Sequence, residues 1–197
     1  MNNLKIASFN CKGFKKRNFD YLRYLFDKND VMFIQESWLY NFELDKVYSI
    51  LPDSCCLGVS AMDETDVSRS GRPFGGCLIV YKKSLSVPLI RVNTDSNRLC
   101  VALIDTEDIK IVFITVYMPC DNGTDASASE FLDVLNEISS ILNIYDGFKI
   151  IIGGDMNVDF NRLSFNSSLL DNFIDDESLI CVDSFLNNND FTFHSYN

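Results

Sequence analysis

The spacing of apolar and polar positions along the chain predicts many strands and few helices. Short apolar or alternating segments bounded by polar or turn-forming residues are typical of strands. Such segments occupy residues 4–9, 31–35, 77–81, 89–92, 99–105, 109–117, 150–153 and 191–194. Because the strands come in runs rather than in strict alternation with helices, the pattern favours a layered α/β or α+β domain whose sheets pack face to face.

A few segments instead have the spacing of an amphipathic helix. They are residues 18–27, a stretch that ends near residue 144, and residues 165–173. Asp125 or Ser127 is expected to cap the second of these helices at its N-terminus. Residues 61–73 are polar and contain glycine and proline, so we expect a surface loop there.

The length of 197 residues is sufficient for one domain with a substantial core, and we expect that domain to cover residues 1–197. No apolar run approaches the ~20 residues that span a membrane, and the N-terminus lacks the apolar core of a signal peptide. The seven cysteines form no CxxC pair, which favours reduced thiols. These features predict an intracellular protein, nuclear or cytoplasmic, with no membrane partner.

The net charge of −11 argues against a protein that binds nucleic acid by charge alone, since such domains are usually basic. It does not exclude an enzyme that meets phosphates through a metal ion. Basic residues nevertheless cluster just after the first predicted strand, at Lys12, Lys15, Lys16 and Arg17. This cluster is either a surface for a phosphate backbone or an ordinary charged helix start.

Several segments end a predicted strand on polar side chains that suit a metal site. These segments are residues 8–10, 34–38, 115–119 and 153–157. In the last of them, Gly153 and Gly154 are expected to let the backbone turn sharply at the strand end. Asp155 and Asn157 then stand two apart and would share one face in extended geometry. A tight turn with an Asx hydrogen bond is the alternative.

These side chains are of the types that phosphoryl chemistry needs. A hard cation such as Mg²⁺ takes oxygen ligands from carboxylates, waters and phosphate, and Glu36 and Asn10 suit that role. Asp155 could orient and deprotonate a water. Asn157 and Tyr117 could donate hydrogen bonds to phosphoryl oxygens in the transition state. Each residue alone could be structural, but their joint occurrence at strand ends favours a functional site.

The ordered set of motifs resembles the endonuclease/exonuclease/phosphatase superfamily. The motifs are Ser8-Phe9-Asn10, Gln35-Glu36, Tyr117-Met118-Pro119 and Gly154-Asp155-Met156-Asn157. Within the superfamily, the chain is most similar to the apurinic-endonuclease-like domain of LINE-type non-LTR retrotransposons. The segments that carry this closer resemblance are residues 35–38, 70–76, 97–99 and 192–195.

The resemblance implies a four-layered α/β sandwich of the DNase I-like type and hydrolysis of a phosphodiester with Mg²⁺, or with Mn²⁺ in its place. It implies that Asn10 and Glu36 hold the metal. Asp155 would position the attacking water, and Asn157 would orient Asp155 or the phosphate. Tyr117 would contact the scissile phosphate.

The resemblance also implies the substrate and partners. DNA would be bound through its phosphate backbone, with substrate contacts at Arg72 and Asn97. In such elements the enzyme nicks target DNA so that the freed 3′-OH primes reverse transcription. A reverse transcriptase domain in the same polyprotein would therefore be the partner.

The chain departs from the family pattern after residues 192–195. The pattern continues with an aspartate-containing strand and a Ser-Asp-His motif that supplies the catalytic histidine, whereas this sequence stops at Asn197. The only histidine, His194, does not match the catalytic one. We therefore expect a domain that lacks its last strands and is incomplete at its C-terminus. Loss of a general acid/base costs ~10²–10⁴ in rate.

Two other functions stay open on this sequence. The first is another branch of the superfamily, either an abasic-site DNA repair endonuclease or a phosphatase acting on inositol phosphates or lipids. Residues 71–76 favour the retrotransposon branch over both. The second is a catalytically inactive fragment, which the missing Ser-Asp-His segment favours and the intact motif residues argue against.

Overall fold

The computed structural model describes residues 4–62, 73–160, 162 and 164–182, which form two compact units. The first unit comprises Met1–Val158 and the second Asp159–Asn197. The expected strand at 191–194 and most of the expected loop at 61–73 lie outside the described residues. None of the helices in the described part of the chain is long and apolar enough to cross a membrane.

The described part of the first unit is built on two mixed sheets of four strands each. The first sheet has the order β1-β2-β4-β3, with bounds Ile6–Asn10, Val31–Gln35, Cys77–Lys82 and Ser54–Val59. The second has the order β5-β6-β7-β8, with bounds Ile90–Val92, Leu99–Asp105, Lys110–Tyr117 and Lys149–Asp155. In each sheet one pair is parallel, β1 with β2 and β7 with β8, and the other pairs are antiparallel.

The two sheets pack face to face through large apolar side chains. Phe33 of β2 and Phe113 of β7 meet edge to face, with ring centroids 6.4 Å apart. Ile79 of β4 and Ile104 of β6 are fully buried in the same cluster. Burial of apolar surface on this scale supplies the main favourable term in folding. The core between the sheets therefore fixes the position of one set of strand ends against the other.

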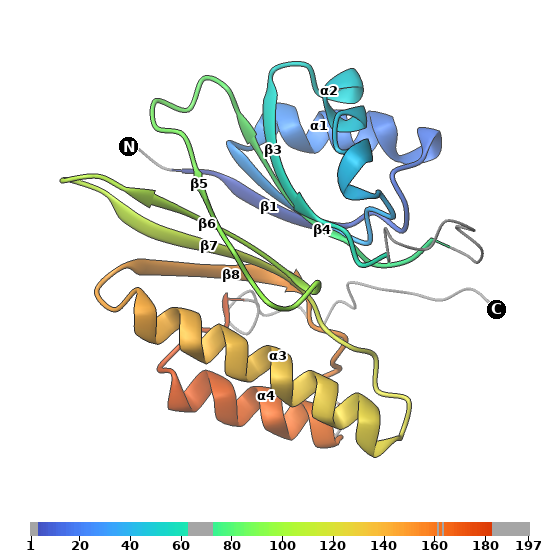
Figure 1. Ribbon diagram of the computed structural model, residues 1–197, viewed down its shortest axis with the longest axis vertical. Coiled ribbons are helices and arrows are strands. Elements are labelled where there is room, and N and C mark those ends of the chain that lie inside the picture. The colour runs from blue at the N-terminus through green and yellow to red at the C-terminus, as the bar shows by residue number, and fades with distance from the viewer. Residues whose placement is uncertain (1–3, 63–72, 161, 163, 183–197) are drawn as a thin grey trace. The chain divides into compact units, whose positions relative to one another are not determined.

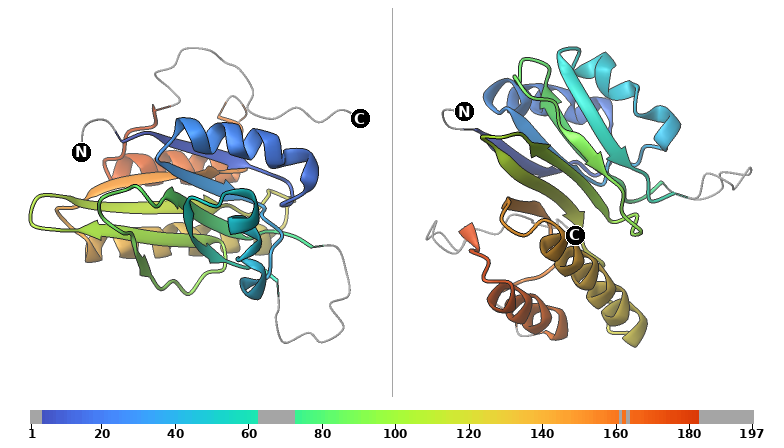
Figure 2. Two further views of the ribbon diagram at one scale, coloured as in Figure 1. Left: turned by 90° about the horizontal axis from the view of Figure 1, so that it is seen from above. Right: turned by 60° about the vertical axis from the view of Figure 1, so that its left-hand side comes forward.

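Helices cover the outer faces of both sheets (Figure 1). Helix α1 (Phe19–Lys28) buries Leu22 and Phe26 against the first sheet, next to α2 (Lys46–Ile50). Helix α3 (Asp125–Ile144) runs along the second sheet on its other side, as the views of Figure 2 agree. Two short 3-10 turns, Lys16–Asn18 and Asn41–Glu43, precede α1 and α2.

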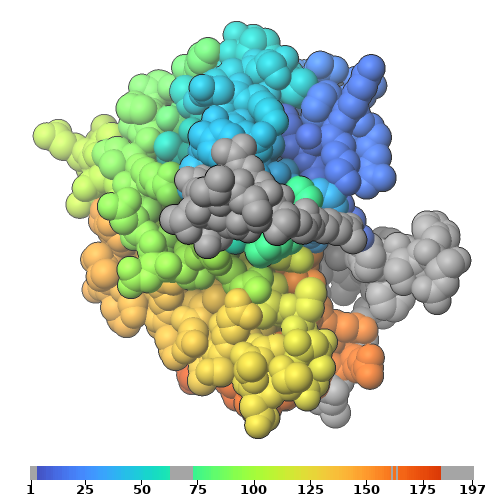
Figure 3. All heavy atoms as spheres, turned by 45° about the vertical axis from the view of Figure 1, so that its right-hand side comes forward, coloured from blue at the N-terminus to red at the C-terminus, as the bar shows by residue number. Residues whose placement is uncertain are grey.

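The first unit thus has four layers, helix, sheet, sheet and helix, which confirms the predicted four-layered α/β sandwich. In the space-filling view of Figure 3, the blue and cyan atoms of the N-terminal segments lie on one side and the yellow atoms of α3 lie on the opposite side. The second unit contains α4 (Phe165–Asp176), capped at its N-terminus by Ser164. The predicted extent of the domain, residues 1–197, stays a prediction.

Two local predictions were wrong. The N-cap of α3 is Thr124, whose hydroxyl accepts a hydrogen bond from the Ser127 backbone N–H, and not Asp125 or Ser127. Gly153 and Gly154 do not turn the chain, because both lie inside β8. Their role is steric: a Cβ on Gly154 would lie 2.0 Å from the Val116 carbonyl oxygen, and one on Gly153 2.7 Å from the Phe33 ring.

Candidate active site

The ends of four strands from both sheets meet at one edge of the sandwich. Asn10 ends β1 and Glu36 follows β2, its parallel neighbour. Tyr117 ends β7 directly opposite Asp155 at the end of β8. Because parallel strands finish at the same edge of a sheet, the four polar side chains converge, and β1 lies against β8 across the sandwich.

One amide group joins the two sheets at this edge. The Asn10 Nδ2 donates to Glu36 Oε1 at 2.7 Å and to Asp155 Oδ2, also at 2.7 Å. Since both carboxylate oxygens lie at that distance from one nitrogen, they can be no farther apart than twice that distance. The Asn10 Oδ1 accepts from the Lys12 backbone N–H at 3.0 Å, which fixes the orientation of the amide.

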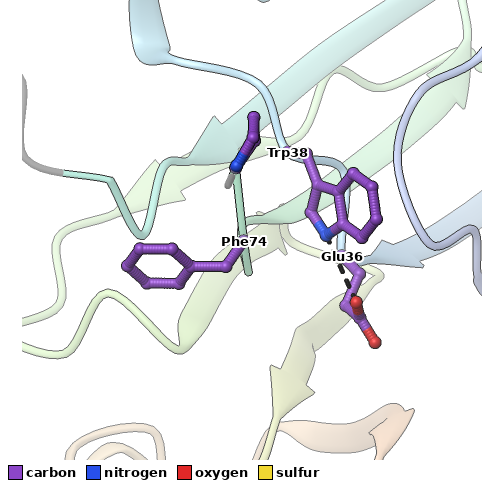
Figure 4. A pocket seen from close by; sticks show the side chains of 4 residues that line it. Glu36, Trp38 and Phe74 are labelled. Atoms are coloured by element: carbon purple, nitrogen blue, oxygen red, sulfur yellow. Dashed lines mark hydrogen bonds between the residues drawn. The ribbon is translucent and has the colours of Figure 1, made fainter. Parts of the chain in front are cut away.

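Both oxygens of the Glu36 carboxylate are held. Asn10 binds Oε1, and the indole Nε1 of Trp38 donates to Oε2 at 3.2 Å (Figure 4). The backbone φ is 51° at Glu36 and 57° at Trp38, a left-handed conformation that bulky residues rarely adopt. Backbone bonds from Gly13 N to Glu36 O (2.7 Å) and from Trp38 N to Gly75 O (3.0 Å) enforce it. Such strain clusters at functional sites.

Tyr117 presents a protonated hydroxyl to the same carboxylate. Burial raises the pKa of Tyr117 well above its usual value, and the negative charge and hydrogen bonding of Glu36 add to the increase. The phenol therefore stays a hydrogen-bond donor throughout the physiological range. Arg98 packs against Tyr117. Its guanidinium carbon lies 5.7 Å from the centroid of the Tyr117 ring, and its Nη1 donates to the Tyr117 carbonyl at 3.3 Å.

Asp155 and Asn157 form a tight turn, and the extended arrangement was the wrong alternative. The backbone φ of Asn157 is 50°, and its N–H donates to Asp155 Oδ1 at 3.1 Å, as in an Asx turn. The Asn157 side chain donates from Nδ2 to the Met118 carbonyl at 2.6 Å. Asp155 is consequently fixed at both oxygens, by Asn10 and by the Asn157 backbone.

The two predicted substrate contacts are not part of this cluster as described. Asn97 is exposed in the loop between β5 and β6, where its amide donates to the Ala61 carbonyl at 3.5 Å. Arg72 lies outside the described residues, as does His194. The residue next to Asn97, Arg98, is the one that reaches the site.

Sequence reasoning had not assigned roles to Gln35, Trp38 and Arg98. Gln35 is almost fully buried and donates from Nε2 to Thr115 Oγ1 at 2.9 Å, across the two sheets. A polar residue ending a five-residue apolar strand was the available signal for Gln35. Trp38 is the only tryptophan of the chain and stands two residues after Glu36, which was the signal there.

The residues present suit a hard divalent cation. The structure places two carboxylates together at one amide, and Mg²⁺ is typically bound by one or two carboxylates with waters and substrate phosphate. Asn10 presents its nitrogen, which is no ligand, to this position, so the carboxylate oxygens are the available donors. Within residues 4–62, 73–160, 162 and 164–182, no group of three His, Cys, Asp or Glu gathers as a metal site.

Comparisons with known proteins agree with this geometry. The model of the endonuclease/exonuclease/phosphatase family matches residues 7–197. An AP endonuclease from Archaeoglobus fulgidus superposes with a TM-score of 0.70 at 18% identity, covering 98% of this chain and 79% of that one. The endonuclease domain of TRAS1, a telomere-specific non-LTR retrotransposon, gives a TM-score of 0.63 at 14% identity, covering 88% and 72%.

A third solved structure, the AP endonuclease LMAP from Leishmania major, gives a TM-score of 0.66 at 15% identity over 87% of this chain and 66% of that one. At such low identity, these similarities establish the fold. No protein with curated annotation matches the sequence.

Proposed function

The chain belongs to the endonuclease/exonuclease/phosphatase family, and we propose that it is a metal-dependent DNA endonuclease that nicks target DNA for a non-LTR retrotransposon. One observation carries the proposal. The Asn10 amide holds a carboxylate of each sheet, Glu36 and Asp155, at the common edge where the strands end. Two fixed carboxylates beside a neutral phenol suit a phosphodiester, which needs a cation, an activated water and a hydrogen-bond donor.

Glu36 and Asn10 act on the metal side of this site. Glu36 would hold Mg²⁺, or Mn²⁺ in its place, through the carboxylate that Asn10 and Trp38 orient. The cation, when bound, supplies Lewis-acid polarisation of the phosphate and stabilises the leaving oxyanion. In the observed orientation Asn10 sets the spacing of the two carboxylates. To place Oδ1 beside the two carboxylates the amide would have to turn over, which would break its bond from the Lys12 N–H.

Asp155, Asn157 and Tyr117 act on the phosphate side. Asp155 accepts the proton of the attacking water, and its two hydrogen bonds keep it aimed at one point. Asn157 holds the Asp155 side chain through its backbone N–H. Tyr117, kept protonated by its raised pKa, donates to a non-bridging phosphate oxygen.

The retrotransposon assignment rests on the loop that ends in Phe74, Gly75 and Gly76. Gly75 and Gly76 have φ of 61° and 86°, and their carbonyls accept the backbone N–H groups of Trp38 and Ser37. This loop therefore supports the Glu36 segment directly. With target DNA as substrate the protein would act in the nucleus, and the nicked 3′-OH would serve a reverse transcriptase domain in the same polyprotein.

Nicking of supercoiled plasmid tests the function. We expect nicking in Mg²⁺ and none in EDTA, and we expect Glu36→Gln and Asp155→Asn to lower the rate by ~10²-fold or more, as for loss of a general base or its equivalent. Asp105→Asn is the matched control, because Asp105 is a half-exposed carboxylate at the opposite end of β6, paired with Lys110.

Equal nicking by Glu36→Gln and by the unchanged chain would contradict the proposal. Other substrates separate the remaining candidates. Cleavage confined to plasmid that carries abasic sites would assign the chain to DNA repair. Release of phosphate from inositol phosphates without nicking would assign it to the phosphatases. No cleavage of any substrate by a folded chain would identify an inactive fragment.

A further inference from the structure

Arg98 holds both polar groups of the Tyr117 backbone. Arg98 immediately precedes β6, and Tyr117 ends β7, the antiparallel neighbour of β6. The Tyr117 N–H donates to the Arg98 carbonyl at 3.0 Å, and Arg98 Nη1 donates to the Tyr117 carbonyl at 3.3 Å. The guanidinium carbon also lies 5.7 Å from the centroid of the Tyr117 ring, close enough for a cation–π interaction. One arginine therefore restrains both the main chain and the ring of Tyr117.

The Arg98 guanidinium is itself fixed from helix α3. Its Nε donates to Glu130 Oε1 at 2.6 Å, an ion pair that joins the end of the second sheet to the helix. The guanidinium is a rigid planar fork, so a bond at Nε determines the direction in which Nη1 points. The Glu130 side chain is half exposed, so its replacement should release the guanidinium without opening the core.

The loop before Arg98 is tied to the same helix. The Glu137 carboxylate accepts the backbone N–H of Asp95 at 2.7 Å and that of Ser96 at 3.0 Å. The Ser96 hydroxyl oxygen in turn accepts the backbone N–H of Arg98 at 3.0 Å. Because Glu130 and Glu137 are two helical turns apart, they lie on one face of α3. Both the main chain and the side chain of Arg98 are thus held by this face.

We propose that Arg98 is a positioning residue that, held by Glu130, keeps the Tyr117 hydroxyl directed at the scissile phosphate. A displacement of about 1 Å from the productive geometry can cost ~10²-fold in rate, so a residue that restrains Tyr117 at three points has a large effect on the reaction. This inference rests on the proposed function and extends the candidate site to helix α3. An ion pair that is open to solvent contributes little to stability, so positioning can be measured separately from folding.

Rates of plasmid nicking test the role of Arg98. Arg98→Lys keeps the charge but loses the planar fork that reaches two acceptors. We expect kcat to fall ~10-fold at a nearly unchanged KM, as when an interaction made only in the transition state is weakened. In a Tyr117→Phe background, Arg98→Lys should lower kcat no further, because the hydroxyl on which Arg98 acts is absent. Glu130→Gln should reproduce part of the loss.

Arg23→Lys is the matched control. Arg23 of α1 makes the same kinds of contact, since its Nη1 pairs with Asp20 at 3.0 Å and its Nε donates to the Ile50 carbonyl at 3.4 Å. We expect Arg23→Lys to nick at the rate of the unchanged chain. Urea unfolding of Arg23→Lys and Arg98→Lys should give similar midpoints, so that a lower rate in the second reflects the site and not the fold.

A spectroscopic readout tests the positioning without DNA or metal. The eight tyrosines are labelled as 3-fluorotyrosine, and the fluorine resonance of Tyr117 is identified by its absence in Tyr117→Phe. Glu130→Gln should shift or broaden this resonance, because the effect passes through Arg98 to the ring. Arg23→Lys should leave the resonance unchanged. The result does not depend on the proposed function, since no substrate is present.

An unchanged kcat in Arg98→Lys would overturn the inference, as would losses for Arg98→Lys and Tyr117→Phe that multiply in the double variant. A higher KM at an unchanged kcat would make Arg98 a DNA contact and would also overturn it. A Tyr117 resonance that Glu130→Gln leaves unmoved would do the same. If the unchanged chain never nicks, the proposed function fails, and the fluorine resonance alone decides whether Glu130 and Arg98 position Tyr117.

Discussion

The two sheets build their halves of the candidate site by different means. The first sheet contributes Asn10, the last residue of β1, and Glu36, and just beyond these strands the backbone becomes irregular: φ is 45° at Lys12 and 51° at Glu36. The second contributes Tyr117 and Asp155, which face each other within the β7·β8 ladder. Left-handed non-glycine residues cost about 1–3 kcal/mol each and persist only where surrounding contacts enforce them.

The difference indicates which contacts each half depends on. The first half relies on bonds between loops that are distant in sequence, such as Gly13 N to Glu36 O and Trp38 N to Gly75 O. The second half relies on the ladder and on close approach of two backbones at Gly154. Damage to the ladder should therefore unfold the protein, whereas damage to the loops should mainly loosen the site.

The largest effect is expected from Gly154→Ala. The new Cβ would lie 2.0 Å from the Val116 carbonyl oxygen, and a backbone atom cannot move aside without opening the ladder. We expect the free energy of unfolding to fall by about 3 kcal/mol or more, at the upper end of overpacking effects. Urea denaturation followed by circular dichroism measures the loss.

Substitutions at two other glycines provide comparisons for the stability loss of Gly154→Ala. Gly13→Ala would meet the Trp38 ring at 2.5 Å, so we expect a smaller loss of stability but a clear change in Trp38 fluorescence. Gly123 has a φ of 74° and open space around it, so Gly123→Ala isolates the backbone strain alone. Equal stability of Gly154→Ala and Gly123→Ala would refute the distinction between the two halves.

A smaller loss of stability is expected from substitutions at Gln35 or Thr115, where a hydrogen bond joins the two sheets. Gln35 and Thr115 are both buried, and the bond between them crosses from one sheet to the other. Gln35→Leu leaves the Thr115 hydroxyl without this partner, which costs about 1–3 kcal/mol. Thr115→Val should cost less, because Gln35 Nε2 also donates to Ser8 Oγ at 3.2 Å. Removal of both partners should cost less than the sum of the two losses. A double-mutant cycle in urea should therefore show coupling, and strictly additive losses would contradict a direct bond.

The smallest change in stability at neutral pH is expected from replacing a buried cysteine, either Cys100 in the second sheet or Cys11 beside the first. Burial raises the pKa of Cys100 in β6 to about 12, and that of Cys11 after β1 also to about 12. The folded state then keeps protons that the unfolded thiols release above their ordinary value of 9.0. The stability that these protons contribute is complete below pH 9.0 and is lost as the pH rises toward about 12.

Replacement of Cys100 by valine should flatten this alkaline loss. The free energy of unfolding is measured in urea between pH 8 and pH 11, and the slope is compared with that of the unchanged chain. If both sheets unfold together, Cys11→Val should flatten the same slope. A slope unchanged by either replacement would show that the thiols do not titrate with unfolding.

The fold could be predicted where burial alone determines the local pattern. Strands Val31–Gln35 and Leu99–Asp105 match their predicted bounds because continuous apolar runs buried on both faces leave no competing interpretation. Strand β3 was missed, since Ser54 to Val59 contains two cysteines and a glycine and has little β-branched character. Its pairing with β4, and not its own sequence, makes it a strand.

The proximity of four of the predicted site residues could be foreseen, whereas their roles stay predictions and the details of their contacts could not be foreseen. Asn10, Glu36, Tyr117 and Asp155 come together because strand ends meet at an edge, which chain order and strand pattern suffice to suggest. The turn at Asn157 was one of two alternatives that the sequence left open, because only its hydrogen bonds to Asp155 Oδ1 and to the Met118 carbonyl in three dimensions decide between them. The orientation of Trp38 could not be predicted, because it depends on a loop some forty residues later.

The hydrogen bond between Asn10 and Asp155 joins positions 145 residues apart, and this has a consequence during translation. At about 5–20 residues per second, the ribosome adds Asp155 roughly 7–30 s after Asn10. Throughout that interval the nascent polypeptide carries Glu36 without its opposing carboxylate. The two carboxylates of the candidate site therefore come together only once β8 has been synthesised and has joined the second sheet.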